Sequence, residues 1–115
     1  MKRIVSYLRI STANQIDNTS IEVQREKIDL YCKLNNITLV QEFKDEGLSA
    51  KGIESREQYK QMMEFIKDID NNVDGILVYK ADRIHRSLKN LMIMIDQLEE
   101  INVSFISITE QFDTS

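Results

Sequence analysis

The stretch that decides the fold is Gly75-Ile76-Leu77-Val78-Tyr79, a nearly continuous apolar run without a charged residue. A strand with one face in water alternates polar and apolar residues, whereas a strand buried on both faces is apolar throughout. Strands of the second kind occur mainly in parallel sheets that helices cover on both sides. Residues 75–79 therefore predict the central strand of an α/β domain.

On either side of this run the sequence alternates between strand and helix patterns. Helices that connect successive strands imply right-handed crossovers and a parallel sheet. The sequence thus predicts a three-layer α/β fold with a mostly parallel central sheet flanked by helices. The predicted strands are residues 4–10, 37–43, 75–79 and 103–109, and the predicted helices are residues 19–34, 55–69 and 87–100.

Local signals mark where the first two helices begin. Thr19 with Glu22, and Ser55 with Gln58, have the spacing of a capping box. The third helix carries its apolar residues at helical spacing, and its methionines are expected to fill the core, as are those of the second helix. The residues concerned are Leu88, Leu91, Met92, Met94, Ile95 and Leu98 in the third helix, and Met62 and Met63 in the second.

Composition is that of one ordinary globular domain. The 115 residues suit a single domain, and the one cysteine, Cys32, excludes an internal disulfide framework and fits a reducing cytoplasm. No apolar run is long enough to span a bilayer, and no signal peptide is visible. The net charge of −4 is unusual for a protein that binds nucleic acid, but residues 2–11 and 80–89 are locally basic.

Polar and charged residues follow three of the predicted strands. In open parallel sheets, ligands bind beyond the carboxyl ends of the strands, near the point where the strand order reverses. We therefore expect these side chains to meet at one edge of the sheet. They are Arg9 and Ser11 after the first strand, Asp45 after the second, and Lys80, Asp82 and Arg83 after the third.

The residue types at this edge favour phosphate chemistry. Arg9 and Ser11 are two apart, so a strand directs both to one face, and Arg83 and Arg86 share a face if their turn is helical. Arginines gathered around a hydroxyl repel one another unless an anion lies among them, and their planar groups match phosphate oxygens. The only histidine, His85, is expected to be a surface or packing residue, so no Ser-His-Asp arrangement is predicted.

Five motifs in order resemble those of the serine site-specific recombinases, the resolvase and invertase family. The residues of several of these motifs resemble those of the large serine recombinases in particular. The motifs are residues 7–12 (YLRIST), 20–24 (SIEVQ), 45–49 (DEGLS) followed by Arg56, 79–87 (YKADRIHRS) and 112–115 (FDTS).

The resemblance implies roles for individual residues. Ser11 would attack a DNA phosphate and form a 5′-phosphoserine link, while Arg9, Arg83 and Arg86 would stabilise the transition state. Gln24 would help to position the reacting groups, and Asp82 would either orient an arginine or handle the serine proton. Further residues expected to bind or position are Tyr7, Asp45, Arg56 and Lys80. Neither a metal nor another cofactor is expected.

The resemblance also implies partners. Residues 1–115 would be an N-terminal catalytic domain without the dimerisation helix and DNA-binding region that follow it in the family. The full-length protein would bind DNA and assemble into a dimer and a synaptic tetramer, whereas the domain alone would be weak or inactive. Two other interpretations stay open: a metal-dependent phosphoryl-transfer enzyme that uses Asp45, Glu46 and Asp82, and a non-catalytic assembly module.

Overall fold

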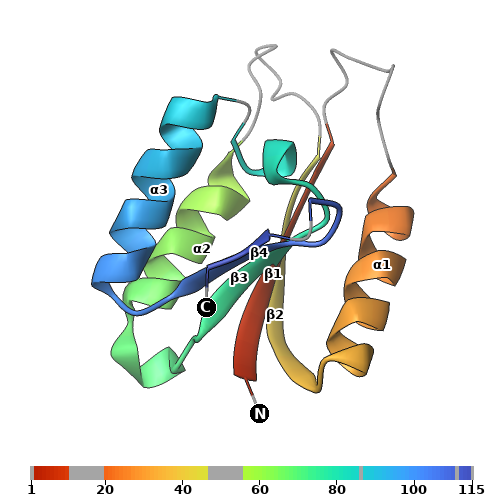
Figure 1. Cartoon of the computed structure of the whole chain (residues 1–115), viewed down its shortest axis with the longest axis horizontal. Helices are drawn as coiled ribbons and strands as arrows, with labels where there is room; N and C mark the ends of the chain where they lie inside the picture. Colours follow the sequence, from red (N-terminus) through yellow and green to blue (C-terminus); the bar gives the residue numbers. More distant parts are fainter. Residues whose placement is uncertain (1, 11–19, 47–55, 86, 111, 115) are drawn as a thin grey trace.

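The computed structural model describes residues 2–10, 20–46, 56–85, 87–110 and 112–114. Its elements alternate along the chain as the sequence predicts, and Figure 1 shows them around a central sheet. The strands are β1 (Lys2–Ile10), β2 (Ile37–Glu46), β3 (Gly75–Val78), β4 (Ser104–Ser107) and β5 (Phe112–Asp113). The helices are α1 (Ile21–Leu34), α2 (Glu57–Lys67) and α3 (Leu88–Glu100), with short 3-10 turns η1 (Ile69–Asn71) and η2 (Ala81–Arg83).

The sheet has the order β2-β1-β3-β4-β5, and its first four strands are parallel. The predicted mostly parallel α/β fold is confirmed. Every residue of β3 is buried, as the apolar run from Gly75 predicts. The chain moves from β1 to β2 on one side and then to β3 on the other, so the strand order reverses between β1 and β3. That reversal places a ligand site at the carboxyl ends of these two strands.

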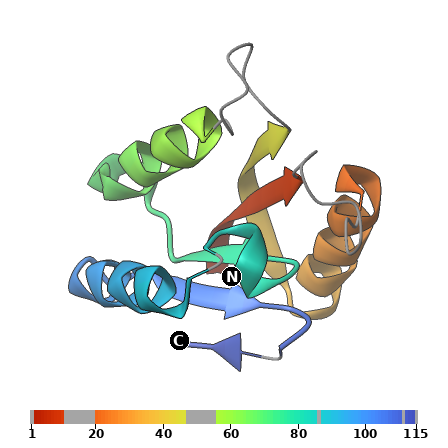
Figure 2. The ribbon, with the colours of Figure 1, turned by 90° about the horizontal axis from the view of Figure 1, so that it is seen from above.

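Helices cover both faces of the sheet, α1 on one and α2 with α3 on the other (Figure 2). The period of two in β1 divides its side chains between the two cores. Ile4 and Leu8 pack with Ile28 and Cys32 of α1, whereas Tyr7 lies in the core beneath α2 and α3. Cys32 is buried, which confirms its expected role as a small apolar residue. Side chains of alternate residues at the end of β1 therefore face opposite layers.

The helix starts differ from those predicted. Ser20, not Thr19, caps α1, and its side chain accepts a hydrogen bond from the Val23 amide. At α2 the cap position is Arg56, which makes no side-chain capping bond, so the helix begins one residue later than the Ser55–Gln58 spacing predicts. Thr19 and Ser55 themselves lie outside the described residues. A carboxylate from another strand caps α2, as shown below.

The third helix buries a narrower face than predicted. Met94, Ile95 and Leu98 are buried, but Leu88 is 72% exposed and Met92 is 47% exposed. Those two were wrongly assigned to the core. Leu88 begins the first turn of α3, which rises beyond the sheet (Figure 1), and Met92 lies outside the face that carries Met94, Ile95 and Leu98. No helix among the described residues has the length and apolarity that a membrane span requires.

The last part of the sheet also departs from the prediction. The predicted strand 103–109 is shorter, and after it the chain turns back to form β5, which pairs with β4 in antiparallel orientation. The Phe105 amide donates to the Thr114 hydroxyl at 2.8 Å, which ties the returning segment to β4. Residues 112–114 thus form the edge of the sheet.

Candidate active site

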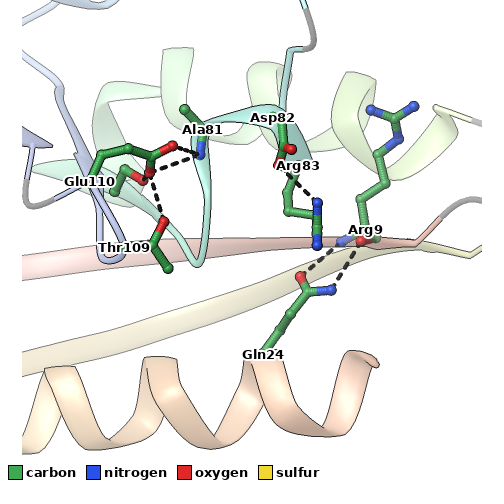
Figure 3. A network of polar contacts seen from close by, with 8 residues as sticks. Arg9, Gln24, Ala81, Asp82, Arg83, Thr109 and Glu110 are labelled. Carbon is green, nitrogen blue, oxygen red and sulfur yellow. Dashed lines mark hydrogen bonds and ion pairs between the residues drawn. The ribbon is translucent and has the colours of Figure 1, made fainter. Parts of the chain in front are cut away.

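A side chain of α1 fixes the backbone at the end of β1. The Gln24 side chain is fully buried, and its amide donates to the Arg9 carbonyl at 3.0 Å while its oxygen accepts from the Arg9 amide at 3.4 Å (Figure 3). Both bonds go to the backbone, so Gln24 fixes the strand where Arg9 leaves it. Ser11 lies two residues further along the sequence and outside the described residues.

The segment after β3 carries the second group of charges, and we name residues 81–85 the arginine turn. Within it, Arg83 is 9% exposed and its Nη1 donates to the Asp82 carboxylate at 2.8 Å. Asp82 itself is exposed at its side chain. A buried guanidinium with an adjacent carboxylate has one prong oriented in advance, which favours bidentate recognition of an anion. Arg86, the other predicted arginine of this motif, lies outside the described residues.

Glu110 anchors the start of the arginine turn. Its two carboxylate oxygens accept from the Ala81 amide at 3.3 Å, and the Thr109 and Ser107 hydroxyls also donate to it (Figure 3). Burial alone would raise the pKa of Glu110, but these hydrogen bonds outweigh it and hold the pKa below its ordinary value. Glu110 therefore stays charged and fixes the turn from the end of β4.

Arg56 reaches the arginine turn from the start of α2. Its Nη2 donates to the Ile84 carbonyl at 2.7 Å, and its guanidinium carbon lies 4.3 Å from the centre of the Tyr59 ring. It also lies 5.7 Å from the centre of the Tyr7 ring, which brings it towards β1. Arg56 thus links the first strand, the second helix and the turn.

Tyr7 and Asp45 form a buried pair beneath Arg56. The Tyr7 hydroxyl donates to the Asp45 carboxylate at 2.5 Å, and the Gln58 and Tyr59 amides donate to the same carboxylate at 3.0 and 3.1 Å. Burial, and then the bond to the carboxylate, raise the pKa of Tyr7 far above its ordinary value, so the phenol stays protonated. Asp45 lies near the end of β2 and accepts hydrogen bonds from two free amides of the first turn of α2. It therefore caps this helix, a position at which a carboxylate is favourable.

Replacing Asp45 by alanine is expected to destabilise the domain by about 3 kcal/mol or more, because each buried donor left without an acceptor costs about 1–3 kcal/mol. Tyr7→Phe removes one bond to a charged group and should cost about 1.5–3 kcal/mol. Urea unfolding followed by circular dichroism measures both. Asp96→Ala, an exposed change on α3, is the control and should alter the free energy of unfolding by less than about 0.5 kcal/mol. Equal effects of Asp45→Ala and Asp96→Ala would contradict the capping role.

The structure brings together most of the residues that the sequence singled out. Arg9 and Asp45 are neighbours in the β1–β2 register, and Lys80 occupies the position before η2. Tyr7 and Asp45, predicted to bind or position, are buried and contact each other. Sequence reasoning missed Glu110 and Tyr59. Glu110 follows a predicted parallel strand just as Asp45 does, and that position was the available signal.

Three arginines gather at the carboxyl ends of the strands. Arg9 and Arg83 are nearly buried, at 5% and 9% exposure, and Arg56 is half-buried beside them. Positive groups gathered at one ligand-binding edge favour an anion there, and arginine matches phosphate oxygens better than lysine does. The three acids described at this site, Asp45, Asp82 and Glu110, already accept hydrogen bonds from protein groups. The arrangement is therefore suited to binding a phosphate and stabilising charge that develops on it.

Comparisons with known proteins agree with this chemistry. Residues 4–115 match the family described as "Resolvase, N terminal domain". The chain is 31% identical to the transposon Tn917 resolvase of Enterococcus faecalis, over 97% of this chain and 52% of that protein. The chain spans about half the length of the curated relatives it matches.

Two solved structures share the fold and 30% of the aligned sequence. A resolvase family site-specific recombinase from Streptococcus pneumoniae aligns with a TM-score of 0.88 and 30% identity, over 99% of this chain and 76% of that one. The N-terminal catalytic domain of TP901-1 integrase aligns with a TM-score of 0.76 and 30% identity, over 98% and 82%. The chain belongs to the resolvase family of serine recombinases, and its residues 4–115 match the N-terminal domain of that family.

Proposed function

We propose that this chain is the catalytic domain of a longer site-specific recombinase, which cleaves and rejoins DNA through a covalent 5′-phosphoserine at Ser11. The observation that carries the proposal is that Arg9 and Arg83, at the carboxyl ends of β1 and β3, are joined there by Arg56 from the start of α2. Arg9 lies two residues before Ser11 in the sequence. Relatives named as resolvases and as a site-specific recombinase support it.

In the proposed reaction the Ser11 oxygen forms a bond to phosphorus while the bond from phosphorus to the 3′ oxygen breaks. The serine loses its proton and the departing 3′ oxygen gains one. Arg9, Arg83 and Arg86 stabilise the charge that develops on the non-bridging oxygens. Reversal of the same step by another 3′ hydroxyl rejoins the strand, so the bond energy is conserved and neither a metal nor another cofactor is needed.

Other residues of the site hold these groups in place. Gln24 fixes the backbone at Arg9, and Asp82 orients Arg83 through their ion pair. Arg56 fixes the arginine turn through the Ile84 carbonyl. Of the two roles considered for Asp82, the ion pair favours orientation of the arginine. Lys80, next to the turn, adds positive charge for the DNA backbone.

The contacts favour this proposal over its two alternatives. A magnesium site would need the carboxylates of Asp45 and Asp82, yet the first accepts three hydrogen bonds inside the protein and the second pairs with Arg83. A module kept only for assembly would have no need for two nearly buried arginines at a ligand-binding edge. We further propose that the full-length protein acts in the cytoplasm, binds DNA, and assembles into a dimer and then a synaptic tetramer.

The test is to incubate the full-length recombinase with DNA that contains its recombination site, in EDTA, and to stop the reaction with denaturant. We expect covalent protein–DNA adducts in which mass spectrometry finds the 5′ phosphate on Ser11. Cleavage that requires Mg²⁺ and leaves no adduct would contradict the proposal and favour the metal-dependent alternative. The 115-residue chain alone is expected to give no specific recombination, and specific recombination by it would contradict the domain assignment.

A further inference from the structure

One contact at the edge of the site has no part in the roles described so far. The Tyr59 hydroxyl and the His85 Nε2 are 2.9 Å apart, and their rings meet edge to face with centroids separated by 5.3 Å. Tyr59 belongs to α2 and His85 ends the arginine turn, two residues after Arg83. The contact therefore joins a helix to the segment that carries a catalytic arginine.

A second contact joins the start of α2 to the arginine turn. Arg56, three residues before Tyr59, donates to the Ile84 carbonyl and stacks on the Tyr59 ring. Tyr59 also meets the buried Tyr7 ring edge to face, with centroids 5.8 Å apart. Since Asp45 holds the Tyr59 amide as well, the tyrosine is fixed from its backbone to its ring. A rigid tyrosine is a suitable reference against which to position the turn.

We propose that Tyr59 and His85 are a positioning pair, whose hydrogen bond holds the arginine turn against α2 and so sets the place of Arg83 in the reaction. The proposal rests on the proposed recombinase function. Neither residue touches the reacting atoms in this scheme, and both act through Arg83. The pair adds to the Arg56–Ile84 contact a link that can respond to pH.

The charges around His85 determine that response. Arg56 faces it from α2 and Arg9 from β1, while Asp82 and Arg83 precede it and Arg86 follows it in the chain. Burial, then Arg56 and Arg9, hold the pKa of His85 below its ordinary value, so the imidazole is uncharged near neutral pH. A proton added at lower pH places another positive charge beside the arginines. The pair is therefore expected to hold above the pKa of His85 and to loosen as pH falls through it.

The first test measures the single-turnover rate of adduct formation and DNA affinity in the full-length recombinase. Tyr59→Phe keeps the ring but removes the hydroxyl, and we expect a rate about tenfold lower, the size of one lost hydrogen bond, with DNA affinity within about twofold. The matched control is Tyr31→Phe on α1, which should leave the rate unchanged. A Tyr59→Phe rate equal to that of Tyr31→Phe would overturn the proposal.

A pH profile separates positioning from a merely structural role. His85→Gln places a side-chain amide where Nε2 lies and does not titrate, so its rate should stay within about threefold of the wild type at pH 8, whereas His85→Ala should lose about tenfold. The ratio of wild-type to His85→Gln rates should fall as pH drops through the pKa of His85. A ratio independent of pH would overturn the proposal.

A second measurement needs no DNA. His85 is the only histidine, so its ring resonance in the NMR spectrum of the 115-residue chain reports its titration directly. We expect the Arg83 Nε–H resonance to move with the same midpoint in the wild type and to show no such step in His85→Gln. An Arg83 resonance that ignores the titration would overturn the positioning pair. Absence of adducts from the wild type would overturn the proposed function instead, and the NMR result would still decide the pair.

Discussion

The Ser11→Ala variant of the full-length recombinase is expected to bind its recombination site with unchanged affinity and to form no covalent adduct. Alanine has no oxygen to bond to phosphorus, so the phosphoserine cannot form, whatever the arginines contribute. The change removes one small polar atom and leaves every described hydrogen bond of the site in place. Denaturing gels of the variant, in EDTA, measure the adduct, and gel shifts measure binding.

A matched serine shows that the loss is specific. Ser104→Ala removes the same oxygen at the start of β4, the end of the sheet opposite the arginine cluster, and should leave adduct formation intact. Thermal unfolding of both variants should match the wild type within a few degrees. Adducts retained by Ser11→Ala would reject Ser11 as the nucleophile, even if the arginines proved essential.

Much of the fold follows from short-range patterns in the sequence. The apolar run at residues 75–79 predicts a strand buried on both faces, and β3 is one. The alternation of strands and helices then fixes parallel crossovers, and with them the edge where Arg9 and Arg83 meet. The five motifs that resemble those of the resolvase family independently indicate functional residues at the same edge.

The features that could not be predicted from the sequence depend on contacts between residues far apart in the chain. A capping box joins residues three apart, but the Gln58 amide at the start of α2 donates to the buried Asp45 carboxylate, thirteen residues earlier. Glu110 holds the Ala81 amide across 29 residues, a pairing that exists only once β3 and β4 lie side by side. The apolar spacing of α3 likewise cannot show that Leu88, at the start of the helix, stays exposed.

Replacing Arg83 by glutamine is expected to slow adduct formation by about 10²–10³-fold, the usual cost of removing one well-placed donor to a developing oxyanion. Arg83 is nearly buried, where charge interactions are screened least, and Asp82 and the arginine turn orient it in advance. Single-turnover rates measure the effect. The control is Arg25→Gln, which breaks a bidentate pair with Glu42 between α1 and β2, contacts none of the described arginines of the site, and should change the rate less than twofold.

The Arg83→Lys variant distinguishes charge from geometry. Asp82 engages one terminal nitrogen of Arg83, at 2.8 Å, and the planar fork has further donors for phosphate oxygens. A lysine has a single ammonium that must serve both partners, so we expect most of the loss to remain, about 10²-fold. A lysine variant with the wild-type rate would show that positive charge alone is sufficient. That result would contradict the proposal that Asp82 and the arginine turn act by orienting the guanidinium of Arg83.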